Sequence, residues 1–296
     1  MLSPISHWLK LCLLGSFVCI VSGCTAYQSN PNENSDSDTI SANPVTAQTP
    51  KRPAKNWLRV SQYAICTDFD LNPTDPLFRE LEDLPGQIQT ELNLPPGNSV
   101  IQVFLFDSQE HYEAYMTVRY PKLPLRRAYF IAEPRAASGD DLLVYTWMGD
   151  HLRTDLRHEL THAVLHSVLK SVPLWLDEGL AGFFELPVAN AGLNESHLEF
   201  MQKGTFQPDL SRLEKLGKVA QMEKPEYREA WAWVHFLLRG SPQAKSCLLA
   251  YLVELQSNPN PGLLSPKIRE SFSEPEAALV DHLAKLTPSK PARSVK

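Results

Sequence analysis

Apolar residues in the first half of the chain recur with two periods, one typical of strands and the other of helices. Residues 57–65 alternate in the manner of a strand, and residues 99–106 are rich in the β-branched and aromatic side chains that favour one. Between them, apolar residues three to four positions apart predict a helix over residues 75–93. Its apolar positions are Leu77, Leu81, Leu84, Ile88 and Leu92.

The remainder of the pattern begins with one helix and two strands and then becomes entirely helical. Asp107 or Ser108 suits the cap of a helix that runs to Arg119, and strands are expected at 128–132 and 142–147. From residue 151 the spacing predicts helices over 151–169, 173–185, 195–203, 226–239, 243–256 and 275–285. Strands that precede helices in this way indicate an α+β protein.

The two ends of the chain differ in composition from this central part. Residues 24–55 are dominated by Asn, Ser, Asp, Thr, Pro and Gln, and such a segment buries too little apolar surface to fold. We expect a disordered tether there and a flexible tail over 287–296. One domain over 56–286 is the simplest interpretation, and a division near 190–205 into a mixed and a helical lobe is the alternative.

The first 23 residues have the features of a secretory signal. Lys10 precedes an apolar run that is too short for a comfortable membrane span, and the run ends in Val-Ser-Gly-Cys. This ending resembles a bacterial lipobox, which implies that Cys24 becomes the lipidated first residue. An ordinary signal peptide or an uncleaved anchor is the alternative. We therefore expect a lipid-anchored protein of the bacterial cell envelope, on the periplasmic side or at the outer membrane.

Composition narrows the function only slightly. The chain of 296 residues is 43% hydrophobic and 21% charged, which is enough apolar material for a sizeable core. A formal net charge of −6 argues against broad nucleic-acid binding, because that function requires a basic face. Cys66 and Cys247 could pair or remain free, and the sequence does not fix the oligomeric state.

A predicted helix carries the arrangement His-Glu-x-x-His. His158 and His162 are four residues apart, so an α-helix places them one turn apart on nearly the same side. Two imidazoles at that separation can bind one zinc ion. Glu159 lies about 100° around the helix from His158, where it can act as a general base on a water at the metal.

The opposite side of this helix is apolar. It carries Leu152, Leu156, Leu160 and Val164. That side is therefore expected to face the core, while the imidazoles face a cleft.

Glu178 is the candidate third metal ligand. It follows His162 by 16 residues, on a second predicted helix that opens after Pro173. Catalytic zinc usually has three protein ligands and one open position, so a return of the chain between these helices would complete the site. The alternatives are a helix pair with surface His and Glu residues, and a zinc site without catalysis.

The two segments HELTH and WLDEGLAGFFE together resemble the gluzincin metallopeptidases, and the wider order resembles the bacterial peptidase MA-like proteins. The similarity covers roughly residues 57–240. It implies a thermolysin-like (zincin-like) catalytic domain with one zinc bound by His158, His162 and Glu178, and with Glu159 as the base. It also implies a peptide or protein substrate. An aminopeptidase is not supported, because no G-x-M-E-N segment is present.

The resemblance is incomplete around the metal. Where thermolysin has an Asp four residues after the ligand Glu, this chain has Gly182. The candidates for carboxylates that orient the ligand histidines are Asp155, Asp177 and Glu185.

The sequence gives less support to candidates for stabilising the transition state than to the candidate metal ligands. Tyr227 and His235 lie in the appropriate part of the chain, although both fit a structural role in a core helix. His151, His166 and His197 are expected at the surface or in local contacts. One of the strands at 128–132 and 142–147 is a candidate edge strand for an extended peptide.

The sequence thus predicts a lipid-anchored zinc peptidase. The alternative is a non-catalytic zinc-binding envelope lipoprotein that acts in binding or assembly.

Overall fold

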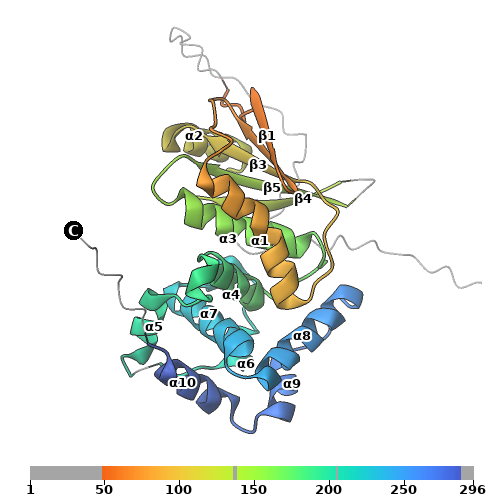
Figure 1. Ribbon diagram of the computed structural model, residues 1–296, viewed down its shortest axis with the longest axis vertical. Helices are drawn as coiled ribbons and strands as arrows, with labels where there is room; N and C mark the ends of the chain where they lie inside the picture. Colours follow the sequence, from red (N-terminus) through yellow and green to blue (C-terminus); the bar gives the residue numbers. More distant parts are fainter. Residues whose placement is uncertain (1–48, 136–138, 205, 288–296) are drawn as a thin grey trace, which may run out of the picture.

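A five-stranded mixed sheet and a group of helices below it form the two halves of the chain (Figure 1). The computed structural model describes residues 49–135, 139–204 and 206–287. The signal segment, Cys24 and most of the expected tether lie outside the described residues, as does the tail beyond Thr287. The α+β class predicted from the sequence is confirmed.

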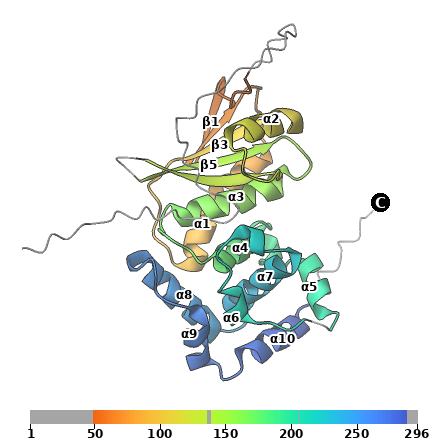
Figure 2. The ribbon, with the colours of Figure 1, turned by 180° about the vertical axis from the view of Figure 1, so that it is seen from behind.

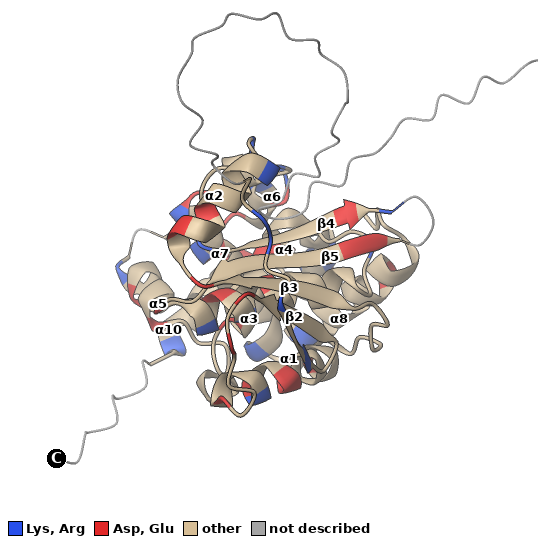
Figure 3. Cartoon of the chain, turned by 90° about the horizontal axis from the view of Figure 1, so that it is seen from above, with Lys and Arg blue, Asp and Glu red and all other residues tan. Residues whose placement is uncertain are grey.

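The sheet has the strand order β1-β2-β3-β5-β4. Strands β1 (Asn56–Val60) and β2 (Tyr63–Thr67) form an antiparallel hairpin. Strands β3 (Ile101–Phe106) and β5 (Asp140–Trp147) continue it in parallel, and β4 (Tyr129–Pro134) pairs antiparallel with β5. Seen from above, β4 lies at one margin of the sheet (Figure 3).

The single strand predicted over 57–65 is wrong, because this segment contains a hairpin turn. Val60 pairs with Tyr63, and Ser61 between them adopts a left-handed conformation with φ of 51°. The buried positions change from even numbers at Val60 to odd numbers at Tyr63 and Ile65, so the alternation is interrupted at the turn and the single-strand prediction overlooked this interruption.

Two helices precede the helical half and agree closely with prediction. Helix α1 (Pro76–Leu92) begins at Asp75, whose carboxylate accepts a hydrogen bond from the first turn. Helix α2 (Gln109–Arg119) is capped by Ser108. Short polar side chains of this kind occupy helix N-termini because they satisfy backbone N–H groups that have no partner within the helix.

The helical half begins with the two helices of the candidate site, α3 (Leu152–His166) and α4 (Leu174–Phe184). The remaining helices are α5 (Glu195–Gln202), α6 (Leu210–Leu213), α7 (Lys224–Arg239), α8 (Pro242–Ser257), α9 (Leu264–Ser271) and α10 (Pro275–Lys285), with 3₁₀ turns at Val188–Asn190 and Val219–Gln221. Helices α6 and α9 were not predicted: α6 has only four residues, and α9 contains a proline.

Different helices cover the two faces of the sheet, α2 on one face and α3 together with α1 on the other (Figures 1 and 2). On one face, Phe104 stacks on its neighbour Tyr145, and Tyr115 of α2 packs over Tyr145 with ring centroids 5.8 Å apart. On the other face, Phe130 stacks on His162 and His166 of α3. Aromatic packing thus fixes α3, and with it the candidate ligands, beneath β4.

Helix α4 is buried along its whole length between α3 and α7. A Cβ atom at Gly179 would lie 2.5 Å from the backbone oxygen of Ala230, so only glycine permits this approach of α7. The buried apolar side chains of both halves belong to one cluster that extends from Val60 to Leu283. No helix among the described residues has the length and apolar character needed to cross a bilayer. Cys66 and Cys247 are both free.

Candidate metal centre

Two imidazoles and one carboxylate meet between α3 and α4. Oε2 of Glu178 lies 3.4 Å from Nε2 of His158 and 3.7 Å from Nε2 of His162. One atom from each of the three residues lies within 4.8 Å of the other two. The structure therefore brings together the three residues that the sequence singled out as candidate ligands.

The outer nitrogen of each imidazole faces a carboxylate. Nδ1 of His158 is 3.0 Å from Oε2 of Glu185, and Nδ1 of His162 is 3.0 Å from Oδ1 of Asp177. A carboxylate beside Nδ1 favours the tautomer that carries its proton there and leaves the lone pair on Nε2 free. Both Nε2 lone pairs then point toward Glu178.

Of the three carboxylates considered for this role, Asp155 has a different partner. Its carboxylate forms an ion pair of 2.8 Å with Arg127. Gly182, which stands where thermolysin has an Asp, lies against the side chain of Trp231. Asp177, the residue just before Glu178, contacts both His162 and His166 instead.

The donor set fits a small divalent cation such as zinc. Ligand atoms about 2.1 Å from a common tetrahedral centre are roughly 3.4 Å apart, close to the distances from Glu178 to the two imidazoles. Oε2 of Glu178 is buried and has no hydrogen-bond partner among the described residues. Three lone-pair-bearing atoms that face one another repel unless a cation or a proton lies between them.

In the absence of a metal, protons are favoured at this position. Burial lowers the pKa of His162, but Asp177 and Glu178 outweigh it and raise the value to about 10. Burial likewise opposes protonation of His158, whose pKa is nevertheless raised well above its usual value by Glu178 and Glu185. Burial would raise the pKa of Glu178, yet the two imidazoles lower it to about 2. The environment is thus strongly attractive to positive charge.

One side of the group remains open. His162 and Glu178 are almost completely buried, whereas 24% of the His158 side chain is exposed. His158 and Glu159 line a cavity of about 420 Å³ together with Arg126, Arg127, Ala128, Thr154, Asp155 and Glu185. This cavity gives small molecules or an extended chain access to the candidate ligands.

Glu159 lies in that cavity without belonging to the ligand group. Burial raises the pKa of its carboxyl, while His158 and His162 lower it. A backbone hydrogen bond from Phe130 also reaches this carboxylate, which places it next to β4. Its position beside the ligand group and next to the sheet suits a group that exchanges protons with a bound molecule.

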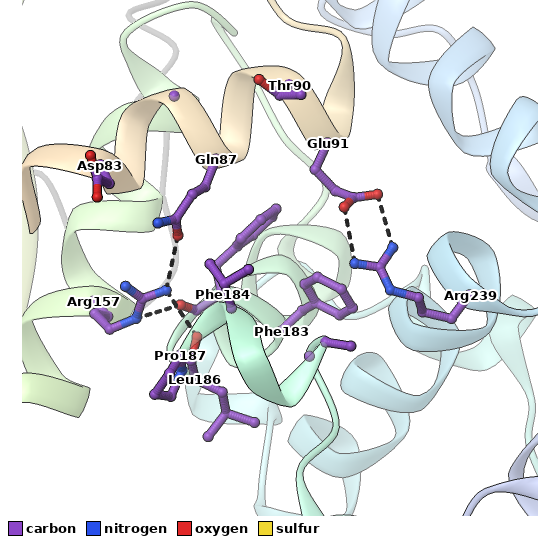
Figure 4. A pocket seen from close by; sticks show the side chains of 14 residues that line it. Asp83, Gln87, Thr90, Glu91, Arg157, Phe183, Phe184, Leu186, Pro187 and Arg239 are labelled. Atoms are coloured by element: carbon purple, nitrogen blue, oxygen red, sulfur yellow. Dashed lines mark hydrogen bonds and ion pairs between the residues drawn. The ribbon is translucent and has the colours of Figure 1, made fainter. Parts of the chain in front are cut away.

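Arg157 fixes the backbone that carries Glu185 (Figure 4). This buried guanidinium donates from Nε to the backbone oxygen of Phe184 at 3.0 Å and from Nη2 to that of Leu186 at 2.9 Å. These carbonyls flank Glu185 at the end of α4, where a helix leaves such groups without partners. The cavity of about 570 Å³ in Figure 4 lies beside this contact and is not lined by any of the three candidate ligands.

Tyr227, at the start of α7, is close to the ligand group. Its hydroxyl is buried and has no hydrogen-bond partner among the described residues. Burial and the charge of Glu178 raise its pKa to about 12, and the nearby Arg126 opposes this increase. Sequence reasoning selected Tyr227 but missed Arg126, which lies in a loop where no motif marks it.

The other histidines lie apart from the ligand group or beside its partners. His235 of α7 is buried against His282 of α10, with Nδ1 and Nε2 2.9 Å apart. His166 contacts Asp177, His197 packs on Trp231, and His151 is exposed. His235 is therefore not positioned to act at the candidate metal centre.

Comparisons with known proteins add no assignment. No protein-family model matches the chain, and no curated protein matches it significantly. The geometry of the site therefore carries the functional argument.

Proposed function

We propose that this protein is a zinc-dependent peptidase of the gluzincin class with a thermolysin-like catalytic domain. His158, His162 and Glu178 hold the zinc, and Glu159 is the general base. The observation that carries the proposal is the convergence of two Nε2 atoms and one carboxylate oxygen, with each Nδ1 held by its own carboxylate. Three protein ligands and an open side are typical of catalytic rather than structural zinc.

Glu159 transfers the proton in the proposed reaction. Zinc, when bound, supplies Lewis-acid chemistry that makes water a better nucleophile near neutral pH. The Glu159 carboxylate takes a proton from the attacking water and then donates it to the leaving amine of the peptide bond. Burial raises its pKa, which brings the carboxyl closer to the pH at which both transfers are fast.

Strand β4 offers a binding edge for the peptide backbone. It lies at the margin of the sheet (Figure 3). Phe130 on this strand contacts Glu159 through its backbone. An extended peptide that adds to such an edge is held by main-chain hydrogen bonds. Of the two strands considered from the sequence, β4 has the free edge, because β5 lies between β3 and β4.

Tyr227 is the proposed donor to the developing oxyanion. Its buried hydroxyl lies near Glu178 and Glu159, and its raised pKa keeps it protonated at neutral pH. A preorganised donor of this kind stabilises the charge that develops on the carbonyl oxygen.

Substitution of Glu159 tests the catalytic mechanism. Zinc-loaded Glu159→Gln should bind as much metal as wild type and fail to hydrolyse a proteome-derived peptide library. His162→Ala should lose both properties. If Glu159→Gln cleaved the library as well as wild type, the proposed role of this residue would be wrong.

The same library separates the peptidase from a non-catalytic zinc-binding envelope lipoprotein. Fully metallated wild-type protein that cleaved no peptide, with or without chelator, would favour the binding or assembly function. The lipid anchor at Cys24 and the envelope location are part of the proposal and rest on the N-terminal sequence. Labelling of cells with a radioactive fatty acid, compared between wild type and Cys24→Ala, tests them independently.

A further inference from the structure

Arg126 lies in the wall of the cavity that contains His158 and Glu159. The loop that carries it, between α2 and β4, is fixed on both sides. The Tyr129 hydroxyl donates to the backbone oxygen of Pro124, and the Thr146 hydroxyl donates to that of Arg127 at 3.2 Å. Arg126 is therefore held near the cavity by contacts to the sheet and within its own loop.

The two arginines of this loop have different partners. Arg127 forms an ion pair with Asp155, whereas no carboxylate among the described residues lies within ion-pairing distance of Arg126. The ionisable groups that act most strongly on Arg126 are the hydroxyl of Tyr227, then that of Tyr129 and the carboxylate of Glu178. Arg126 is also exposed to solvent. A guanidinium in this situation retains donors for a planar anion such as a carboxylate.

The position of Arg126 relative to β4 indicates which part of a peptide it meets. Antiparallel pairing is the more stable way for a strand to add to an edge. Because Glu159 acts on the scissile bond and contacts the backbone of Phe130, the residues after that bond run toward the start of β4. Arg126 is four residues before Phe130, a distance of roughly 13 Å in an extended chain. A long side chain there can reach the first few residues after the scissile bond.

We propose that Arg126 makes the enzyme selective for substrates with a carboxylate within about three residues after the scissile bond. This inference rests on the proposed peptidase function and assigns a substrate class to it. The carboxylate belongs either to an Asp or Glu side chain or to the free C-terminus of the peptide. Both present the same planar anion to the guanidinium.

The test compares cleavage sites of wild type and Arg126→Gln in a proteome-derived peptide library read by mass spectrometry. We expect wild type to prefer Asp and Glu after the cleaved bond by about tenfold over Asn and Gln, as charge-assisted hydrogen bonds are the stronger ones. Arg126→Gln should bring this ratio close to one. Arg126→Glu should reverse it in favour of Lys and Arg.

Synthetic peptides separate the two sources of the carboxylate. Peptides that match the best cleaved sequence are made with Glu or Gln after the scissile bond and with a free or an amidated C-terminus. Selectivity that follows the side chain identifies an acidic residue as the determinant, and selectivity that follows the terminus identifies a carboxypeptidase-like preference. Peptides that are cleaved equally well in all four forms would overturn the inference.

A matched control removes an arginine far from the cavity. Arg269 of α9 pairs with Glu276, and Arg269→Gln should keep the wild-type preference. If Arg126→Gln lowered kcat/KM equally for every peptide, Arg126 would act on the reaction centre or on Tyr227, and the selectivity inference would fail.

A binding measurement distinguishes this failure from failure of the peptidase proposal. Zinc-loaded Glu159→Gln, with and without Arg126→Gln, is applied to an array of extended peptides that differ only by Glu or Gln. Preference for Glu peptides that depends on Arg126, without any cleavage by wild type, would reject the peptidase and retain the carboxylate site. Cleavage without such preference would reject the carboxylate site and retain the peptidase.

Discussion

In the part of the chain that the structure describes, two pairs of neighbouring histidines have opposite surroundings. At the candidate metal centre, His158 and His162 each have a carboxylate at Nδ1 and share Glu178 at Nε2. Between α7 and α10, Nδ1 of His235 lies 2.9 Å from Nε2 of His282.

The charges around the two pairs explain their different behaviour. Carboxylates raise the pKa of His162 to about 10, despite burial. Burial, together with smaller effects of the nearby His282 and Arg239, lowers the pKa of His235 to about 3. Proximity of two imidazoles therefore does not make a metal site. A metal site also needs carboxylates that orient the imidazoles and a third anionic group, and among the described residues only the first pair has both beside it.

Loss of one imidazole should show the largest difference between the two pairs. His162→Ala removes a ligand from a three-residue site, so bound zinc should fall from one per chain to none and hydrolysis should cease. His282→Ala should leave both unchanged. Zinc is measured by mass spectrometry of the intact protein under native conditions. Equal zinc loss in both variants would show that the first pair has no special role.

Substitution of the proposed general base should reduce catalysis and leave zinc binding unchanged. Glu159→Gln should lower kcat by about 10²–10⁴, the usual contribution of a positioned general base, while zinc content stays at one per chain. Kinetic assays and metal analysis on the same preparation check this. Loss of zinc in Glu159→Gln would instead make Glu159 a ligand.

The carboxylates beside the imidazoles should affect affinity by a smaller amount. Asp177→Asn keeps the shape of a fully buried side chain but weakens its hold on His162, and the zinc Kd should rise by about 10–100-fold. Competition with a chelator of known affinity measures the change. Glu185→Gln should have a weaker effect, because Glu185 is more exposed.

Zinc should compete with protons at the first pair. In the metal-free protein the raised pKa values of His158 and His162 keep both imidazoles charged at pH 7, and bound zinc requires them neutral. Affinity should therefore rise with pH up to about 10, and binding at pH 7 should release protons. Calorimetry in buffers of different ionisation enthalpy counts them. Binding without proton release would contradict the charged state assigned to these imidazoles in the metal-free protein.

Protonation of the second pair in acid should lower the stability of the fold by a modest amount. The lowered pKa of His235 means that the fold favours its neutral form, so stability is present above the unfolded value near 6.5 and declines as the pH falls toward 3. Between pH 7 and pH 5, the Tm of metal-free wild type should fall by more than the Tm of metal-free His235→Gln. Equal losses would show that this pair does not titrate as described.

The local pattern predicted much of the fold and selected the three candidate ligands that the structure brings together. Helical spacing located α1, α3 and α4, and the four-residue spacing of His158 and His162 follows from helix geometry. The local pattern could not predict contacts between segments that are far apart in the sequence. The shift of the buried positions from Val60 to Tyr63 and Ile65 was a local sign of the hairpin that the prediction overlooked, whereas nothing local marks Arg157 as the partner of the carbonyls around Glu185.

The carboxylates of the site show where sequence reasoning stopped. Asp155, Asp177 and Glu185 were equivalent candidates, because each lies near the ligands along the chain. The choice between them depends on how α4 packs against α3 and α7, and that packing depends on the missing side chain of Gly179. Arg126 could not be selected at all, since its role depends on a cavity assembled from several elements.

X-ray absorption at the zinc edge, on protein purified without added chelator, tests the central claim most directly. We predict one zinc per chain with two imidazole nitrogens and one or two further oxygen ligands at about 2.0–2.2 Å, and loss of one imidazole in His158→Ala. A wild-type protein without zinc, or a zinc spectrum that His158→Ala leaves unchanged, would contradict the assignment of His158, His162 and Glu178 as the metal centre.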